Sequence, residues 1–269
     1  MSKQKGIFSF FLSLLLCCGL VLTGTGCAKQ EEPEKPVEVV KPEEPQEEKE
    51  EDKRSQDPKD PVNRKIDWKK YQDENSDVYA WIYIPGTTVD YPILMSAKDA
   101  DTHFYLTHDI DGNSSIFGSV YAENFQEKDF SDPVTVLYGH SYFDGNNQLI
   151  WNADPAVKMF TDLHKYEDGD YLNENPKMYI YTPEKTYVYD IFSARVFDDR
   201  YIPYSYEFEK DAEFEEYLKD ITAAGGNLNK NMPEITPESG IVTLSTCVGV
   251  GSDQRYIVSA TRTEEWDAA

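Results

Sequence analysis

Two runs near the C-terminus constrain the fold more than any other part of the chain. Residues 241–247 and 255–261 are rich in β-branched and aromatic side chains, and the segment between them contains two glycines. This pattern predicts two antiparallel strands joined by a loop. Because successive side chains of a strand point to opposite faces, the residues of both runs can be sorted by face.

The sorting gives one apolar and one polar face. The apolar face consists of Val242, Leu244, Tyr256, Val258 and Ala260. The other face consists of Thr243, Ser245, Cys247, Arg255 and Ser259, with Ile257 as its one apolar member. We therefore expect Cys247 and Arg255 to share a face, each at the end of its strand where the loop opens.

A thiol beside a fixed cation suits nucleophilic chemistry. The cation favours the thiolate and can stabilise an oxyanion that develops during the reaction. The alternative is that Cys247 is a small buried hydrophobe, which is common for a free cysteine.

A nucleophilic cysteine needs a base, and one of the four histidines is well placed. His140 ends the apolar run 133–139, which predicts a strand, and the turn-rich segment 141–147 follows it. Strand ends are where a scaffold presents catalytic side chains. His103 and His108 lie in a polar, Asp-rich segment and His164 follows an amphipathic stretch, so we expect surface positions for these three.

The N-terminal region predicts export. Two lysines precede an uncharged apolar run over residues 6–24, so residues 1–27 are interpreted as a signal peptide, a lipoprotein signal or a membrane anchor. The segment before Cys27 resembles a lipobox, in which this cysteine becomes acylated, although Gly24 stands where an aliphatic residue is preferred. A lipoprotein signal and an uncleaved anchor would both leave the rest of the chain outside the cell and tethered to the membrane.

Residues 28–62 are rich in Glu, Lys and Pro, a composition that predicts a disordered acidic spacer. Residues 63–269 would then form one domain. Because Cys17, Cys18 and Cys27 all belong to the targeting segment, Cys247 has no disulfide partner within this domain. An unpaired thiol in an exported protein is open to oxidation, which favours a catalytic role over a passive one.

The overall charge disfavours one class of partner. The chain has 50 Asp and Glu against 26 Lys and Arg, a net charge of -24. Nucleic-acid binding needs a basic surface.

The elements between the termini indicate a mainly β fold with peripheral helices. Further strands are expected at 80–84, 89–94, 119–122, 177–182 and 186–197. One or two short helices are expected between Ile66 and Trp81, one over 155–163 and one over 211–224 that stops at Gly225. The segment from Asp109 to Asn113 has the wrong spacing for a calcium loop and predicts a turn.

These residues together resemble the sortases, the cysteine transpeptidases of Gram-positive cell surfaces. The resemblance rests on Leu244-Ser-Thr-Cys247, on Arg255 before a strand, and on Tyr138-Gly-His140. The class B sortases are resembled by the segment from Trp81 to Ile93, by Phe104-Tyr-Leu106, by Gly118-Ser-Val-Tyr121 and by the helix-rich segment 208–224. The similarity covers about Ile66 to Arg262. It departs at Gly249, where class B members often carry an acidic residue.

The resemblance implies a closed eight-stranded barrel, with N-terminal helices and a helix inserted before the last two strands. It also implies that Cys247 is the nucleophile, His140 the general acid and base, and Arg255 the group that stabilises the oxyanion or the substrate. The substrate would be a Pro- and Thr-containing sorting signal on another exported protein. The acceptor would be an amine of a peptidoglycan precursor or a pilin, and no metal or organic cofactor is implied. The location would be the outer face of the cytoplasmic membrane.

Two other hypotheses remain open at this point. The chain could be another exported Cys/His enzyme of the cell wall, either a peptidase or an enzyme like the L,D-transpeptidases, although the latter carry a histidine beside the cysteine where this chain has Thr246. It could also be a non-catalytic binding module tethered at the surface, which predicts that Cys247 is replaceable without loss of function.

Overall fold

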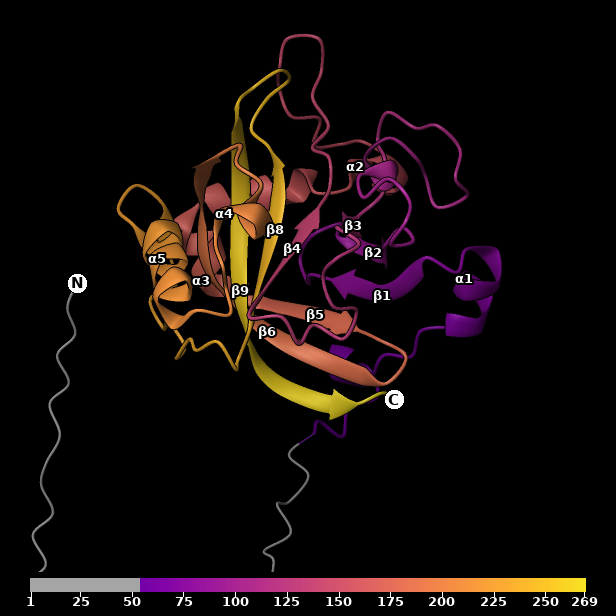
Figure 1. Cartoon of the computed structure of the whole chain (residues 1–269), viewed down its shortest axis with the longest axis horizontal. Helices are drawn as coiled ribbons and strands as arrows, with labels where there is room; N and C mark the ends of the chain where they lie inside the picture. The colour runs from indigo at the N-terminus through magenta and orange to yellow at the C-terminus, as the bar shows by residue number, and fades with distance from the viewer. Residues whose placement is uncertain (1–53) are drawn as a thin grey trace, which may run out of the picture. The chain divides into compact units, whose positions relative to one another are not determined.

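The computed structural model describes residues 54–269, which form a closed β-barrel with short helices around it (Figure 1). The strands are β1 (Val78–Tyr83), β2 (Asp90–Leu94), β3 (Tyr121–Ala122), β4 (Val134–Tyr138), β5 (Lys177–Tyr181), β6 (Lys185–Asp198), β7 (Asn227–Leu228), β8 (Ile241–Cys247) and β9 (Gln254–Asp267). Their order is β5-β1-β2-β3-β4-β8-β9-β6-β7, and an additional pairing of β5 with β6 closes the barrel. Eight strands make the closed wall, and β7 pairs only with β6 outside it. The predicted eight-stranded barrel is confirmed.

The pairing of β4 with β8 is parallel, and it decides where the two strands end. Tyr138 lies opposite Ser245 at the last rung. Two parallel strands finish at the same end of the sheet. The chain segments that follow them, the loop 141–150 and the β8–β9 turn, rise above this end of the barrel (Figure 1). The two loops are in contact, because Val250 N donates to Asn147 Oδ1 at 2.7 Å.

The barrel interior is one apolar core. Leu137 of β4, Ile180 of β5, Ile191 of β6, Leu244 of β8 and Val258 of β9 belong to it. A second apolar cluster lies on the outer face, where Val136 and Ile257 pack with Phe214 and Ile221 of α5 (Asp211–Thr222). The predicted face assignment is confirmed, since all five apolar-face residues of β8 and β9 lie in the inner cluster and Ile257 lies in the outer one.

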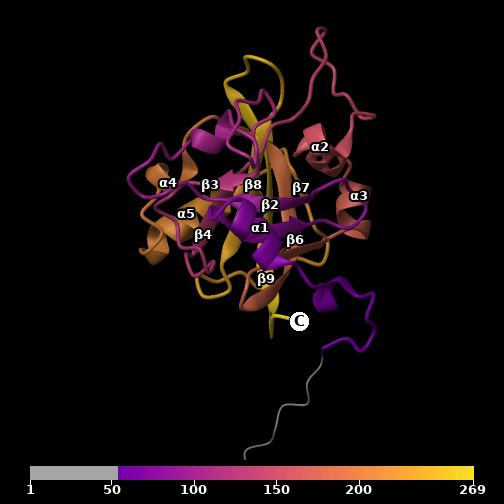
Figure 2. The same cartoon turned by 90° about the vertical axis from the view of Figure 1, so that its right-hand side faces the viewer.

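The remaining helices are short. They are η1 (Pro61–Asn63), α1 (Trp68–Glu74), η2 (Phe104–Leu106), α2 (Pro155–Lys158), η3 (Thr161–Glu167), α3 (Gly169–Glu174) and α4 (Ile202–Ser205). Helix α1 begins after Asp67, whose side chain accepts a hydrogen bond from Lys70 N. It lies on the outside of the barrel wall (Figure 2), where the ring of Tyr71 is 4.8 Å from that of Trp81.

The structure corrects two predicted helices. The segment from Ile66 to Trp81 is helical only over α1. Val78 to Trp81 lie in β1, where burial on both faces produces an apolar run without alternation. The single helix expected over 155–163 is two helices. It breaks at Met159, whose φ of 41° cannot continue a right-handed helix. The helix predicted over 211–224 is confirmed to within two residues, and Gly225 with a φ of 98° follows it.

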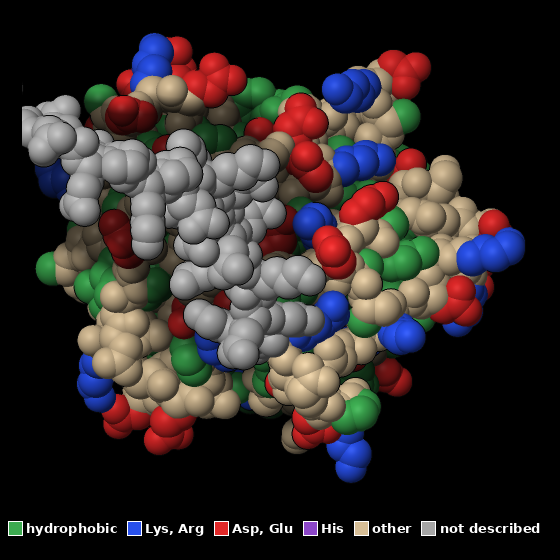
Figure 3. All heavy atoms as spheres, turned by 90° about the horizontal axis from the view of Figure 1, so that it is seen from below, with side chains coloured by type: hydrophobic (Ala, Val, Ile, Leu, Met, Phe, Trp, Pro, Cys, Tyr) green, Lys and Arg blue, Asp and Glu red, His purple; other side chains and the backbone are tan. Residues whose placement is uncertain are grey.

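The described chain contacts the barrel from Arg54 onward, within the stretch predicted as spacer. Arg54 donates to the Asp267 carbonyl at 2.9 Å, and the Tyr181 hydroxyl donates to the Pro61 carbonyl at 2.8 Å. Residues 1–53, which include Cys17, Cys18 and Cys27, lie outside the described residues. Within residues 54–269 no helix has both the length and the apolar character that a membrane crossing requires. The face seen from below carries acidic and basic side chains side by side (Figure 3).

Candidate active site

Cys247 and His140 follow the same rung of the β4–β8 ladder. Gly139 N donates to the Ser245 carbonyl at 3.2 Å, and the Ser141 and Thr246 hydroxyls are hydrogen-bonded at 2.7 Å. His140 therefore lies between Gly139 and Ser141. These two residues are hydrogen-bonded to Ser245 and Thr246, which directly precede Cys247. The parallel pairing brings together two chain segments that are about a hundred positions apart in the sequence.

Cys247 is the last residue of β8, and its cross-strand partner is Arg255 of β9. Directly opposed residues of antiparallel strands have Cβ atoms about 5 Å apart on one face, so the shared face predicted for this pair is confirmed. Both side chains are half-buried, and Cys247 is the free cysteine of the described chain.

The turn between β8 and β9 fixes the orientation of Arg255. Its Nη1 donates to the Ser252 carbonyl at 3.1 Å and to the Gln254 carbonyl at 2.9 Å. A guanidinium has five N–H donors. Holding Nη1 in this way anchors the fork to the backbone and leaves donors on the other nitrogens for a substrate oxygen.

His140 is oriented by a backbone carbonyl of the short helix η2. Its Nε2 is 2.8 Å from the carbonyl oxygen of Leu106, the last residue of η2. Because a carbonyl oxygen only accepts, Nε2 is the donor, and Nδ1 is left for proton transfer.

A glycine before His140 is required by packing. A Cβ at Gly139 would lie 2.7 Å from the ring of Phe160, which is closer than real contacts allow. Phe160 N in turn donates to the His140 carbonyl at 2.9 Å. The absence of a side chain at position 139 therefore lets the segment containing Phe160 pack directly behind His140.

The three other histidines do not all lie at the surface. His103 and His108 are half-buried. His164 is buried, with a side chain only 2% exposed, and the prediction of a surface position for it is wrong. Its Nε2 is 3.1 Å from the carbonyl oxygen of Cys247, so this histidine belongs to the surroundings of the site.

The match to known families covers most of the barrel. The Sortase domain model matches residues 82–263. The chain belongs to the sortase family. Sortase B of Listeria monocytogenes is 30% identical over 176 residues, and this match covers 65% of each chain, just under two thirds of the relative's length. Sortase B of Staphylococcus aureus is 26% identical over 188 residues, covering 69% of this chain and 70% of the relative.

A solved structure shares the fold of this chain. The structure of a Staphylococcus aureus sortase B–substrate complex is similar, with a TM-score of 0.60 and 23% identity, covering 73% of this chain and 84% of that one. The class B resemblance drawn from the motifs is confirmed by the two sortase B relatives.

Gly249 is where this sortase departs from the class B pattern, and the structure gives a steric reason. A Cβ at position 249 would lie 2.7 Å from the Asn147 side-chain amide. The same Asn147 accepts from Val250 N at 2.7 Å. An acidic side chain at position 249 would therefore displace the contact that joins the two loops above the site.

A buried acid lies beside the strand that leads to His140. Glu123 has a side chain with no exposed area, and the Tyr138 hydroxyl donates to its Oε2 at 3.1 Å. Burial raises the pKa of Glu123 to about 7. His103 Nε2 lies 3.8 Å from Glu123 Oε1. Sequence reasoning missed this group, because a single Glu after a short strand has no pattern of its own.

The Asp109 segment of the sortase is a turn, as predicted. Asp109 Oδ1 accepts from Asp111 N at 3.0 Å and from Asn113 N at 2.8 Å. Throughout residues 54–269, no group of three or more His, Cys, Asp or Glu side chains is arranged to hold a metal ion.

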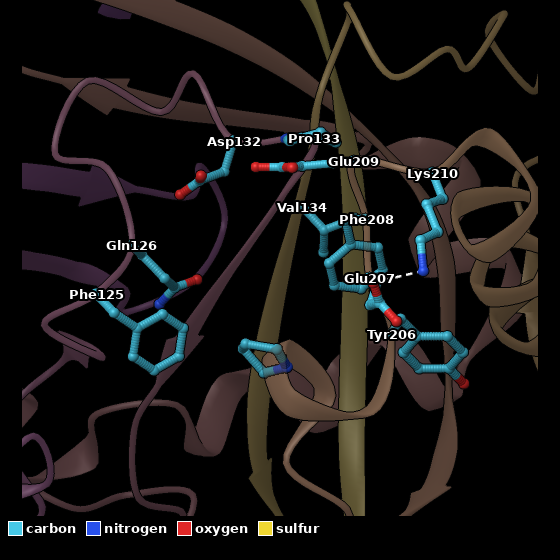
Figure 4. Close-up of a pocket in the computed structure, with 11 residues that line it drawn as sticks. Phe125, Gln126, Asp132, Pro133, Val134, Tyr206, Glu207, Phe208, Glu209 and Lys210 are labelled. Atoms are coloured by element: carbon cyan, nitrogen blue, oxygen red, sulfur yellow. Dashed lines mark ion pairs between the residues drawn. The ribbon is translucent and has the colours of Figure 1, made fainter.

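One of the pockets of the described chain lies away from Cys247. It has a volume of about 320 Å³ and is formed by the start of β4 and the segment between α4 and α5 (Figure 4). Val134, Phe208 and Glu207 are among its lining residues. Val134 begins β4 and His140 follows its end, so about 20 Å of extended chain separates the pocket from the histidine at ~3.3 Å per residue. The pocket is therefore not where the thiol reacts.

Proposed function

We propose that the chain is a class B sortase-type cysteine transpeptidase that cleaves the sorting signal of another exported protein and transfers it to an amine. The observation that supports the proposal is the parallel β4–β8 register, in which the strands that lead to His140 and Cys247 end at the same end of the barrel. The Cys247–Arg255 rung adds a cation on the same face.

In the first half-reaction, the Cys247 thiolate attacks the Thr carbonyl carbon of a Pro- and Thr-containing motif. A C–S bond forms and the C–N bond breaks, while His140 gives a proton to the departing amine. Because Nε2 of His140 is held by the Leu106 carbonyl, Nδ1 is the atom that transfers this proton.

In the second half-reaction, an acceptor amine attacks the thioester. His140 takes the proton that the amine loses, the C–N bond forms, and the thiolate leaves. Arg255 stabilises the oxyanion in both steps through the donors that the turn carbonyls leave unused.

The partners and location follow the same proposal. The acceptor is an amine of a peptidoglycan precursor or a pilin lysine. The protein acts at the outer face of the cytoplasmic membrane, tethered through a lipid on Cys27 or through an N-terminal anchor. Mass spectrometry of the native N-terminus distinguishes the two tethers, since an intact Met1 contradicts lipidation.

The test of the activity uses the full chain and a fluorogenic peptide library built on Pro- and Thr-containing cores. The expected result is cleavage of some members and a mass adduct on Cys247, released faster when a short amine is added. The control is Cys247→Ala. If this variant keeps the wild-type turnover, the protein is a different enzyme or a binding module.

A further inference from the structure

His164 lies directly behind the proposed nucleophile. It belongs to η3, and its ring stacks on Tyr256 of β9 at 4.9 Å with an interplanar angle of 21°. The edge of its ring also faces Phe143 at 6.2 Å. A buried imidazole is costly unless its nitrogens are hydrogen-bonded, and both nitrogens of His164 have partners.

The partners of His164 lead to Cys247. Its Nδ1 is 2.6 Å from Glu167 Oε1, while Nε2 is 3.1 Å from the Cys247 carbonyl oxygen and 3.2 Å from Ser141 Oγ. Because a carboxylate and a carbonyl oxygen both accept, satisfying these two contacts takes a proton on each ring nitrogen. Glu167 is then the counter-charge of the ring.

The contact with Cys247 continues the ladder where β4 leaves it. In a parallel ladder the acceptors along one edge recur at every second residue. Gly139 N bonds the Ser245 carbonyl, so the next acceptor on this edge is the Cys247 carbonyl. The chain after His140 has turned toward η3, where Tyr142 N donates to Thr161 Oγ1. His164 supplies the donor at this point.

We propose that His164, oriented by Glu167, is a positioning residue for the proposed nucleophile. It holds the Cys247 carbonyl and the Ser141 hydroxyl together, and so fixes the two chain segments that carry Cys247 and His140. The turn after Cys247 contains Gly251 with a φ of 69°, and glycine gives the backbone freedom that such a contact restricts. The inference rests on the proposed transpeptidase function.

Two substitutions at His164 separate hydrogen bonding from packing. His164→Phe keeps an aromatic ring against Tyr256 and removes all three polar contacts of the ring nitrogens. His164→Gln loses the ring but can donate an amide N–H to the Cys247 carbonyl. Glu167→Gln removes the counter-charge at a side chain that is 58% exposed, where the fold tolerates change. Glu174→Gln, at an exposed residue of α3, is the matched control.

The readouts are single-turnover acylation of Cys247 by the best library peptide, alkylation of the thiol by iodoacetamide, and the melting temperature. Misplacing a reacting group by about 1 Å can cost on the order of 100-fold in rate. We expect His164→Phe to acylate about 10- to 100-fold more slowly, Glu167→Gln about 3- to 10-fold more slowly, and Glu174→Gln at the wild-type rate. His164→Gln should recover most of the loss, and alkylation should change by less than about threefold throughout.

Two results at His164 would overturn the proposal. Acylation by His164→Phe within about twofold of wild type would overturn the proposal, and so would an equal loss of alkylation and acylation. If His164→Phe does not fold, Glu167→Gln decides alone, and an unchanged rate in it overturns the proposal. A wild-type chain that forms no adduct on Cys247 contradicts the proposed function instead. Adduct formation by the wild-type chain is therefore measured before any variant is compared.

Discussion

The inner and outer faces of the β8–β9 pair are made by the same two strands, yet they differ in what they contact. The inner face carries Val242, Leu244 and Val258, which are buried in the barrel core. The outer face carries a chain of hydroxyls, in which Thr243 is bonded to Ser259 at 2.9 Å and to the Tyr217 hydroxyl of α5 at 2.7 Å. It ends in the rung of Cys247 and Arg255.

The difference shows how one hairpin can serve stability and chemistry separately. Apolar burial is non-directional and tolerates exchange of similar side chains. Hydrogen-bonded and charged groups depend on geometry. Substitutions on the inner face should therefore change the free energy of unfolding, and substitutions at the end of the outer face should change the rate.

The sharpest test of this separation is Cys247→Ala. We expect it to abolish peptide cleavage and thioester formation, because no other cysteine of the described chain can replace the thiol. The melting temperature should stay within about 2 °C, since the thiol is half-buried and makes no core contact of the kind that Leu244 makes. A large fall in melting temperature would show that the outer face also carries stability.

Arg255→Lys should have the next largest effect. A lysine keeps the charge but cannot reproduce the guanidinium fork that the Ser252 and Gln254 carbonyls anchor. Losing a preorganised donor costs roughly 100- to 1000-fold in rate. Single-turnover acylation of Cys247 measures it, and a rate within a few-fold of wild type would remove Arg255 from the site.

Leu244→Ala tests the inner face three residues before the nucleophile. Leu244 is fully buried, and truncating such a side chain costs about 2–5 kcal/mol of unfolding free energy. Urea unfolding measures this cost. The acylation rate per folded molecule should remain near wild type, so a comparable loss of rate would contradict the separation of the two faces.

The smallest expected effect concerns Glu123, on the outer side near Tyr138. Burial raises its pKa to about 7 from an ordinary 4.5, so the folded state binds this proton more tightly than the unfolded state. The stabilisation is complete below about pH 4.5 and is lost as the pH rises through 7. Glu123→Gln should therefore flatten the fall in unfolding free energy between these pH values. An unchanged slope in pH-dependent urea unfolding would show that Glu123 does not titrate in this range.

Much of the fold was predictable because local patterns and global structure agree. The alternation over 241–247 and 255–261 assigned each side chain to the correct face, and the apolar run ending at His140 is β4. The barrel closure and strand number came with the family resemblance. The boundary errors arose where neighbours override pattern, as at Val78 to Trp81, which is buried on both faces.

The site was only partly predictable. The rung of Cys247 and Arg255 follows from strand pairing and could be read from spacing. The position of His164 depends on how η3 packs behind β8, a contact between residues 83 positions apart. Its sequence neighbours gave one usable signal, Glu167 at the third position after it, but that pair is equally typical of an exposed helix. The burial of Glu123 likewise depends on tertiary packing.

The parallel pairing of β4 with β8 affects when the site can form during synthesis of the chain. Synthesis reaches His140 well before Cys247, and strand β4 cannot pair with β8 until residues near the C-terminus exist. Non-local pairings of this kind form slowly, because the long intervening chain must be ordered first. The proposed reactive pair can therefore form only after the chain has been made as far as Cys247. An incomplete chain holds His140 without Cys247, and therefore cannot form the proposed thioester.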